Sequence, residues 1–326
     1  MKVLVLGGAG YIGSVVARTL LDRDHEVVIY DNLSAGHTDA LPKHAEFVRG
    51  DIADGRSLRK IFTEQDFDAV MHFAGLIQAG ESMQQPGLYF ANNVAYVINL
   101  VNVMVEHSVV NFVFSSSAAV YGNPTRIPID ESSPACPTNP YGESKLIVEQ
   151  VLKWYGSQCG LNHANLRYFN AAGATDDLGE DHHPETHLIP LALDSVLGTG
   201  PALTIYGTDY PTPDGTCVRD YIHVLDLADA HALALEKVAL GETFTCNLGN
   251  GMGFSVREVI DTVSRITGKR TPVVEGPRRP GDPKILVASS EKAKRLLGWI
   301  PRRNDLGDIV ESAWLWKFGH PKGFQI

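Results

Sequence analysis

The stretch Lys2-Val-Leu-Val-Leu-Gly7-Gly-Ala-Gly10-Tyr-Ile-Gly13 at the start of the chain decides the fold class. Its first half is a continuous apolar run, which is typical of a strand that is covered on both faces of a parallel sheet. Gly7, Gly10 and Gly13 follow in the pattern Gly-x-x-Gly-x-x-Gly, and helical periodicity runs over about residues 12–21. A strand, a glycine turn and a helix in this order predict a corner where the backbone approaches a diphosphate and the helix N-terminus supplies N–H groups to it.

The alternation of strands and helices continues through the first half of the chain. Short β-branched or aromatic runs at residues 27–30, 47–51, 69–73 and 112–114 predict four more strands, and apolar spacing at 58–62 and 90–106 predicts helices. Strands that alternate with helices of this length form βαβ units with right-handed crossovers. We therefore predict an α/β fold of the Rossmann type with a doubly wound parallel sheet.

The second half is less regular and predicts a smaller lobe beside the sheet. Residues 171–190 carry acids and histidines without clean periodicity, and the stretches 207–217 and 270–283 are rich in turn residues and in proline, respectively. A strand and a helix are expected at 221–238, and another helix at 255–267. The predicted division is a dinucleotide-binding domain (1–169 and about 217–246) and a smaller α/β substrate-binding lobe (170–216 and 247–326).

Composition and charge narrow the classes of partner. The 326 residues are 44% hydrophobic, as in ordinary globular proteins, and their formal net charge is −10. This acidic balance argues against a nucleic-acid partner, which requires a basic footprint. The apolar runs are shorter than the roughly 20 residues of a membrane helix, so no membrane association is expected. Four widely spaced cysteines predict reduced thiols in a cytoplasmic protein: Cys136, Cys159, Cys217 and Cys246.

Asp31 ends the second predicted strand and is the acidic partner of the glycine corner. A carboxylate at this place accepts hydrogen bonds from both ribose hydroxyls of an adenosine and repels a 2′-phosphate, so the pattern favours NAD over NADP. Asp51-Ile52 and Phe73-Ala74-Gly75 follow the next strands and are candidate cofactor contacts, because ligands of open parallel sheets lie beyond the carboxyl ends of the strands. For Ile52 and Phe73, packing in the core is an equally good interpretation.

Tyr141 and Lys145 form the strongest catalytic signal in the sequence. They lie four residues apart on a helix that begins at Pro140, so they share one face. We expect the ammonium to favour the phenolate and to lower the tyrosine pKa from about 10, which would make it a base for a sugar or alcohol hydroxyl. Ser117, at the end of the fifth strand after Ser115, is placed to hydrogen-bond the same hydroxyl.

The glycine corner, Ser117, Tyr141 and Lys145 together resemble the extended short-chain dehydrogenase/reductase family, and in particular its nucleotide-sugar epimerases. The segments that carry this likeness span nearly the whole chain, and residues 207–224 are far more specific than the glycines. The segments are Asp31-Asn-Leu-Ser34, His72-Phe-Ala-Gly75, Gly80-Glu-Ser82, Asn92-Asn93, 115–122, Asn139-Pro-Tyr-Gly142, Leu166-Arg-Tyr-Phe-Asn170, Tyr210-Pro-Thr-Pro-Asp-Gly-Thr216 and Val218-Arg-Asp-Tyr-Ile-His-Val224.

The resemblance implies a reaction in which bound NAD is recycled. Tyr141 would take the proton of the sugar 4-hydroxyl while the hydride from C4 passes to NAD, and the resulting 4-keto sugar would turn about its link to the diphosphate. The hydride would then return to the other face. The substrates implied are UDP-galactose and UDP-glucose. The family also implies a homodimer, for which the helix at 90–106 and the helix after Tyr141 are candidates.

The resemblance and the patterns above together assign the site residues. The expected cofactor contacts are Gly7, Gly10, Tyr11, Ile12, Gly13, Asp31, Asn32, Ser34, Asp51, Ile52, Phe73, Ala74, Gly75, Asn92, Ser115, Tyr141, Lys145, Tyr168 and Phe169. The expected substrate contacts are Ser117, Tyr141, Asn170, His187, Leu188, Thr204, Ile205, Tyr206, Arg219, Arg279, Asp282 and Leu286. Among these, Arg219 and Arg279 offer forked donors to a diphosphate, and Asp282 suits ribose hydroxyls.

Three positions depart from the family pattern. Ile77-Gln78 stands where many relatives have a lysine that reaches the NAD diphosphate, so this position bears on how tightly NAD is held. His187 stands where many relatives have an asparagine on the substrate diphosphate. Leu286 stands at the position that gates the 2-substituent of the sugar, so it bears on whether N-acetylated sugars fit.

Three alternatives remain beside this interpretation. A related epimerase of UDP-N-acetyl or UDP-pentose sugars fits the same residues, because a fold does not determine the substrate. A nucleotide-sugar dehydratase would need an Asp-Glu pair where Ala118-Ala119 stands. A non-catalytic NAD-sensing protein would typically lack Tyr141 or Lys145, and both are present.

Histidines and acids gather in a short segment that resembles a metal-ligand set, namely His182-His183, Glu185 and His187. Zinc requires ligands that converge and that are held by an ordered second shell. The segment lies in a predicted loop beside Pro184, where such convergence is not expected. We therefore predict a polar loop and no metal.

Overall fold

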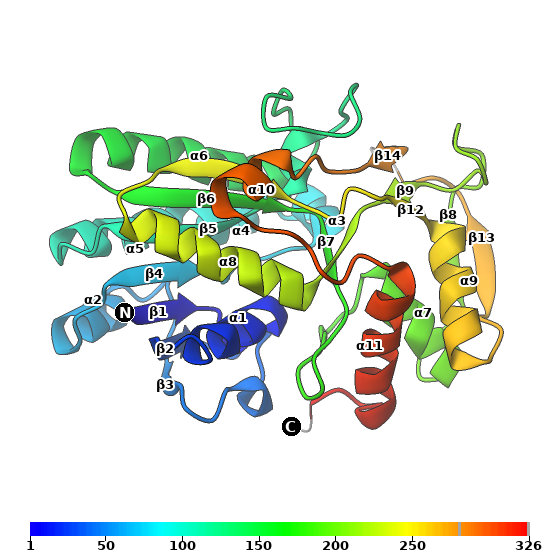
Figure 1. Cartoon of the computed structure of the whole chain (residues 1–326), viewed down its shortest axis with the longest axis horizontal. Coiled ribbons are helices and arrows are strands. Elements are labelled where there is room, and N and C mark those ends of the chain that lie inside the picture. Colours follow the sequence, from blue (N-terminus) through cyan, green and yellow to red (C-terminus); the bar gives the residue numbers. More distant parts are fainter. Residues whose placement is uncertain (280–281, 325–326) are drawn as a thin grey trace.

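The computed structural model describes residues 1–279 and 282–324. Its centre is a seven-stranded parallel sheet with helices on both faces, and a smaller lobe lies beyond the carboxyl ends of the strands (Figure 1). The strands are β1 (Lys2–Leu6), β2 (Glu26–Asp31), β3 (Glu46–Arg49), β4 (Ala69–His72), β5 (Asn111–Ser117), β6 (Asn162–Tyr168) and β11 (Phe244–Leu248). Their order is β11-β6-β5-β4-β1-β2-β3, and every pair is parallel. The predicted Rossmann-type α/β fold is confirmed.

Two helix layers bury the two faces of this sheet. One layer contains α1 (Tyr11–Leu21) and α8 (Val224–Ala239), and the other contains α2 (Gly55–Glu64), α5 (Tyr96–Glu106) and α6 (Pro140–Cys159). On β1, Val3 and Val5 are fully buried under the first layer, whereas Leu4 and Leu6 are fully buried under the second. This two-sided burial explains the continuous apolar run that opens the sequence.

The smaller lobe has a core of its own. Its helices are α7 (Leu188–Leu197), α9 (Val256–Thr267) and α11 (Leu306–Gly319), and they bury Leu193, Val259 and Ile309 between them. Its short strands pair as β8 (Leu203–Tyr206) with β13 (Val273–Gly276), as β9 (Val218–Arg219) with β12 (Phe254–Ser255) and β14 (Ile285–Leu286), and as β7 (Asn170–Ala172) with β10 (Tyr221–His223). Because β7 follows β6 and β10 precedes α8, this last pair joins the lobe to the sheet.

Several observed boundaries differ from the predicted ones. β3 ends at Arg49 rather than at residue 51, because the Asp51 carboxylate turns the chain by accepting the N–H of Ala53 at 2.8 Å. β11 extends to Leu248, and α10 (Glu291–Leu297) packs against α8 and β11, although the predicted lobe includes residues 247–326. The sequence pattern does not predict α7, α10 or α11. The division into a domain and a lobe stays a prediction.

The helix predicted at 90–106 starts earlier and has three parts: α4 (Pro86–Phe90), a turn of π-helix (Ala91–Ala95) and α5. Within residues 1–279 and 282–324, Pro86–Glu106 is the one helical segment whose length and composition would allow it to cross a membrane. Its Val97, Leu100 and Val101 are buried against the sheet, which is the behaviour of a core helix in a globular domain.

The loops of the sheet domain also contain three short helical segments: Thr38–Ala40, α3 (Ala79–Gln84) and Ala118–Tyr121.

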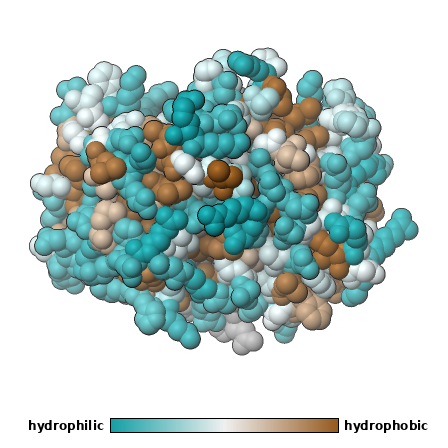
Figure 2. Space-filling model, viewed as in Figure 1, coloured by the Kyte–Doolittle hydropathy of each residue, from teal (hydrophilic) through white to brown (hydrophobic). Residues whose placement is uncertain are grey.

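On the face shown in Figure 2, hydrophilic side chains cover most of the surface, and hydrophobic ones lie in separate patches.

Candidate active site

The glycine corner joins β1 to α1 where the strand order of the sheet reverses, between β1 and β4. Gly7 has a φ of +77°, and a Cβ on it would lie 2.5 Å from the backbone nitrogen of Ala74, just after β4. A Cβ on Gly13 would overlap the carbonyl oxygen of Gly7, and Gly10 is the N-cap of α1. Because only glycine fits at Gly7 and Gly13, the backbone N–H groups of the helix N-terminus stay accessible to an anion.

Asp31 lies at the end of β2 beside this corner. One carboxylate oxygen accepts the N–H of Ala9 at 3.0 Å, and the other accepts the N–H of Leu33 at 2.8 Å. Burial raises the pKa of Asp31, and these two hydrogen bonds oppose the rise. A carboxylate oxygen accepts more than one hydrogen bond, so both oxygens can still receive ribose hydroxyls.

The other predicted cofactor residues follow the carboxyl ends of the strands. Asn32 donates to the Asp51 carboxylate at 2.8 Å and so ties the loops after β2 and β3 together, and its own side-chain oxygen accepts the N–H of Ser34. The side-chain oxygen of Asn92 is buried and has no hydrogen-bond partner in the described chain, which is the kind of atom that a bound ligand satisfies. Ile52 is buried in the core, where packing alone accounts for it.

Several predicted cofactor residues are held by packing or by hydrogen bonds near the carboxyl ends of the strands. Tyr11 donates its hydroxyl to the carbonyl of Gly173 at 2.6 Å and so links the glycine corner to the chain that enters the lobe. The rings of Phe73 and Tyr168 lie 5.0 and 6.1 Å from the buried ring of His231. The remaining members are Ile12, which packs on the first core, Ser115, whose Oγ lies 3.3 Å from the same histidine, and Phe169, which is buried in a small core cluster.

Asn93, rather than its neighbour Asn92, holds the loop after β4. Its side-chain oxygen accepts the N–H of Leu76 at 2.9 Å, and its amide donates to the carbonyl of Leu76 at 2.9 Å and to the hydroxyl of Ser144 at 3.2 Å. A Cβ on Gly75 would lie 3.1 Å from the same side chain. The pair Asn92-Asn93 in the sequence is the signal for this role, but it does not tell which asparagine turns inward.

Ser117, Tyr141 and Lys145 meet where β5 ends and α6 begins. The side chain of Asn139 caps α6 by accepting the N–H of Gly142 at 2.8 Å. Gly142 packs so closely on the turn after Ser117 that a Cβ would lie 2.5 Å from a backbone oxygen of that turn. The cap and the glycine therefore bring the first turn of α6, with Tyr141, against the end of β5.

Burial controls the titration of the two catalytic groups. Lys145 is 5% exposed, its Nζ donates to the carbonyl of Ser115 at 2.9 Å, and burial lowers its pKa to about 8. Burial also raises the pKa of Tyr141, and the Ser117 hydroxyl opposes the rise. The Lys145 ammonium lies 6.0 Å from the centre of the Tyr141 ring. The expectation that the lysine lowers the tyrosine pKa is therefore wrong for this structure, because desolvation is the larger effect.

A buried ion pair behind the catalytic residues is absent from the sequence predictions. Arg167 on β6 donates to both carboxylate oxygens of Glu149 on α6, at 2.9 and 2.5 Å. Ser116 donates to Glu149 at 2.6 Å, and Arg167 also donates to the Tyr121 hydroxyl at 2.9 Å. These contacts satisfy both charges and fasten α6 to β5 and β6. The available signal was the place of Glu149, one helical turn after Lys145 on the same face of α6.

A cavity of about 350 Å³ lies in the lobe next to this site. Asn170, which follows β6, lines it and is held by two hydrogen bonds from its backbone and side-chain nitrogens to the Asp220 carbonyl, at 3.0 and 2.9 Å. The cavity contains most of the predicted substrate residues, which are Asn170, His187, Leu188, Thr204, Tyr206, Arg219, Arg279 and Asp282.

Cations and an aromatic ring characterise the wall of this cavity. Arg219 forms an ion pair with Asp282, and the guanidinium of Arg279 lies 3.9 Å over the centre of the Tyr206 ring. Four predicted substrate contacts do not line it: Ser117, Tyr141, Ile205 and Leu286. Ile205 is buried in the core of the lobe, and Leu286 packs on the cluster that contains Phe169 and the turn after Ser117.

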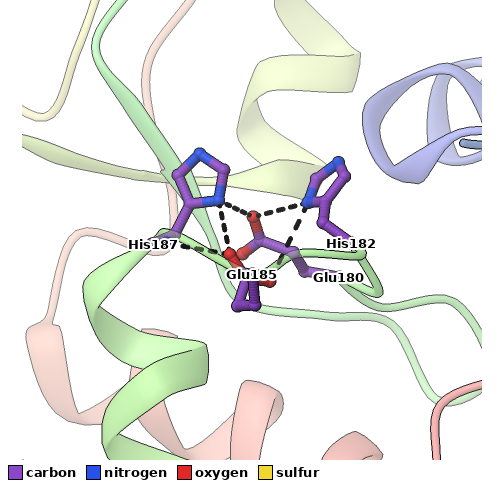
Figure 3. Close-up of side chains that lie close together, drawn as sticks. All are labelled: Glu180, His182, Glu185 and His187. Carbon is purple, nitrogen blue, oxygen red and sulfur yellow. Dashed lines mark hydrogen bonds and ion pairs between the residues drawn. The ribbon is translucent and has the colours of Figure 1, made fainter. Parts of the chain in front are cut away.

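Residues 180–187 differ from the loose polar loop that the sequence predicts. Glu180, His182, Glu185 and His187 turn toward one another (Figure 3). The Nδ1 of His187 lies 2.7 Å from Glu180 and 2.8 Å from Glu185. Burial lowers the pKa of His187, but the two carboxylates outweigh burial and raise it to about 11.

The fold and the site define a Rossmann-type enzyme in which Ser117, Tyr141 and Lys145 come together beside a cavity lined by two arginines. The chain belongs to the NAD dependent epimerase/dehydratase family, whose model matches residues 3–249.

Known relatives resemble the chain over its whole length. The UDP-glucose 4-epimerases of Lacticaseibacillus casei and Halalkalibacterium halodurans are 48% and 50% identical to it, over 99% of this chain and 99% and 98% of theirs. The structure of UDP-glucose 4-epimerase from Brucella ovis in complex with NAD has a TM-score of 0.93 at 45% identity, and covers 96% of this chain and 97% of that one. The Bifidobacterium longum enzyme in complex with NAD+ and UDP has a TM-score of 0.95 at 38% identity, over 99% and 100%.

Proposed function

We propose that this chain catalyses the NAD-dependent interconversion of UDP-galactose and UDP-glucose by oxidation and reduction at C4 of the sugar. One observation carries the proposal: the catalytic residues and the nucleotide cavity are adjacent. Ser117 on β5 pairs in register with Tyr168 on β6, and Asn170, two residues further on, lines the cavity. A sugar attached to a nucleotide in that cavity can therefore reach the catalytic set. The full-length similarity to UDP-glucose 4-epimerases supports the same reaction.

The residues of this chain fit NAD and have distinct roles toward it. The glycine corner leaves room for a diphosphate, and Asp31 is placed to accept hydrogen bonds from ribose hydroxyls. The side-chain oxygen of Asn92, which has no hydrogen-bond partner in the described chain, can accept a hydrogen bond from the cofactor. NAD supplies a hydride acceptor and donor when it is bound. Ile77, where many relatives have a lysine, is 39% exposed and brings no charge to the diphosphate.

The proton is handled by Tyr141 with Ser117 and Lys145. The Ser117 hydroxyl lies where it opposes the rise that burial causes in the pKa of Tyr141. Lys145 is fixed by the carbonyl of Ser115 and places a cation on the same face of α6. In its phenolate form, Tyr141 would accept the proton of the sugar 4-hydroxyl and return it after the sugar has turned.

The substrate must be held at its nucleotide end and left free at its sugar end. Arg219 and Arg279 are the cations for the diphosphate, and the ion pair of Arg219 with Asp282 fixes the guanidinium in place. Asn170 is the predicted sugar contact that lines the cavity, and Leu286 packs nearby on the cluster of the turn after Ser117. Firm nucleotide contacts together with weak sugar contacts allow the 4-keto ring to present its other face.

A second substrate class is favoured by one comparison. The UDP-Glc/GlcNAc 4-epimerase of Campylobacter jejuni has a TM-score of 0.86 at 41% identity. Leu286, at the position that gates the 2-substituent, is half-buried beside the catalytic turn. We therefore keep UDP-N-acetylhexosamines as the second candidate substrates.

The decisive experiment is incubation of the purified protein with UDP-galactose and no added NAD, followed by an assay for UDP-glucose. Turnover is expected, and it also shows that NAD stays bound despite Ile77. Turnover only after NAD is added keeps the reaction and makes the cofactor exchangeable. No turnover with NAD present contradicts the proposal, and UDP-N-acetylgalactosamine is then the next substrate to assay.

We also propose that two copies of the chain form a homodimer. Met83, Leu88 and Trp154 are large hydrophobic side chains that are 63%, 46% and 69% exposed. They lie on α3, α4 and α6, which pack against one another, and an apolar surface of this kind is typical of a protein interface.

The four free thiols support the predicted cytoplasmic location, where cysteines stay reduced.

A further inference from the structure

Glu180, His182, Glu185 and His187 converge beside the substrate cavity (Figure 3). Each offers one ligand atom, and these atoms all lie within 4.8 Å of one another. The Nδ1 of His187 lies 2.7 Å from Oε1 of Glu180, and the Nδ1 of His182 lies 3.3 Å from the same oxygen. Each of the two imidazoles thus directs its Nδ1 atom toward the carboxylates of Glu180 and Glu185. The proposed reaction does not explain this arrangement.

We propose that these four side chains form a structural Zn²⁺ site. Two imidazole nitrogens and two carboxylate oxygens are donors that zinc accepts in a tetrahedral arrangement. Zinc bonds of about 2.0–2.1 Å place tetrahedral ligands roughly 3.3 Å apart. The nitrogen–oxygen separations in the cluster extend from 2.7 to 3.9 Å and so bracket that value. The ligand atoms, which all lie within 4.8 Å of one another, would draw together by side-chain rotation when the metal binds.

The charges of the cluster favour a dication. The side chains of Glu180 and Glu185 are 7% and 12% exposed, and the His187 imidazole that lies between them offers at most one positive charge to two carboxylates. One Zn²⁺ would take the place of the proton on His187 and, with two neutral imidazoles, would balance both carboxylates. The Nδ1 of His182 is buried and makes no well-aligned hydrogen bond in the described chain, its nearest acceptor being Oε1 of Glu180 at 3.3 Å, and a bond to the metal would satisfy it.

The surrounding chain orients the ligands before a metal arrives. Oε1 of Glu185 accepts the backbone N–H groups of Thr186 and His187 at 2.6 and 2.7 Å, which leaves Oε2 for coordination. Asp181, between Glu180 and His182, accepts the N–H of Phe324 at 2.8 Å and so anchors the segment to the end of the chain. Contacts of this kind fix the direction of metal ligands.

The site has a structural rather than a catalytic character. Four protein ligands complete the coordination of zinc and leave no position for water or substrate. Glu180 and His187 also line the substrate cavity, and His187 directly precedes α7. Zinc would therefore hold the loop that forms one wall of the cavity and the start of that helix.

The test measures metal content on the full-length protein, so it is independent of the proposed reaction. We expect one zinc per chain by inductively coupled plasma mass spectrometry. After chelator treatment we expect the midpoint of thermal unfolding to rise with free zinc. The matched variants are His182→Ala and His183→Ala. His183 is the adjacent histidine, but its side chain is 76% exposed and it faces Asp181 instead of the cluster. His182→Ala should lose the zinc and the thermal response, and His183→Ala should keep both.

Two outcomes overturn the proposal. One is a wild-type protein that takes up no zinc from micromolar solution. The other is an equal loss of zinc in His182→Ala and His183→Ala. Glu185→Gln is a second variant that keeps the shape of the side chain and removes one charge. It should also weaken zinc binding, and it serves as the test if His182→Ala does not fold.

Discussion

Replacement of Lys145 by methionine should stabilise the nucleotide-free protein at neutral pH while it abolishes catalysis. Burial lowers the pKa of Lys145 from 10.5 to about 8. At about 1.4 kcal/mol per pH unit, the charged ammonium costs the fold about 3 kcal/mol at pH 7. Methionine avoids this cost but gives up the hydrogen bond to the Ser115 carbonyl, which contributes roughly 1 kcal/mol. The expected net gain is about 2 kcal/mol in the free energy of unfolding.

The pH dependence of this gain follows from proton binding. Below pH 8 the lysine is protonated in both states, so the full cost is present. Between about pH 8 and 10.5 the unfolded lysine keeps its proton and the folded one has lost it, so the stability of the wild type rises with pH. The variant lacks this rise. Its advantage should shrink above pH 8 and be gone near pH 10.5, where the lost hydrogen bond remains as a small disadvantage.

Urea unfolding followed by tryptophan fluorescence measures the effect at pH 7 and pH 10. Lys153→Met is the matched control, since Lys153 is an exposed lysine on the same helix. The control should change stability by less than about 0.5 kcal/mol at both pH values. The reasoning is refuted if Lys145→Met is no more stable than the wild type at pH 7, or if its gain is as large at pH 10.

Three further predictions concern the base, the cofactor and the interface. Tyr141→Phe should lower turnover by about 10²–10⁴-fold, since it removes the proton transfer, while NAD absorbance in the purified protein is unchanged; near-normal turnover would exclude Tyr141 as the base. Asp31→Ala should weaken NAD binding and reduce discrimination against NADP, as measured by fluorescence titration of both nucleotides; an unchanged preference would contradict its role. Trp154→Glu should halve the molar mass seen by light scattering, whereas Leu240→Glu, at another exposed apolar side chain, should not; two dimeric variants would place the interface elsewhere.

The parts of the fold that the sequence predicts are those in which local pattern and burial agree. β1 is buried on both faces, so its apolar run and the glycines after it admit one interpretation. β3 lies at the edge of the sheet, where only β2 fixes its length, and its predicted end at residue 51 was two residues too far. α7 was missed because its first residues follow an aperiodic polar segment, and the helix is buried on the side that faces the lobe core.

In the candidate site, too, the sequence predicts the features that depend on local geometry and does not predict those that depend on tertiary packing. Tyr141 and Lys145 were found from a spacing that helix geometry turns directly into proximity, since residues four apart share a face. The sign of the Tyr141 pKa shift was not predictable, because it depends on how much of the surrounding chain excludes water from the phenol. Arg279 in isolation is a surface charge on sequence grounds, and its place over the Tyr206 ring arises only from the fold of the lobe.

The Glu180–His187 cluster shows where sequence reasoning reaches its limit. The rejection of a metal rested on the premise that a loop beside Pro184 cannot converge its ligands. The side chains of a loop can point toward one another only if contacts with distant parts of the chain hold the loop in place. The hydrogen bond from the Phe324 N–H to Asp181 is such a contact, because it joins residues 143 positions apart. A contact of that separation leaves no periodic trace in the segment itself. The residue types were therefore visible from the sequence, whereas their geometry is a product of tertiary packing, and the zinc titration tests whether that packing has built a site.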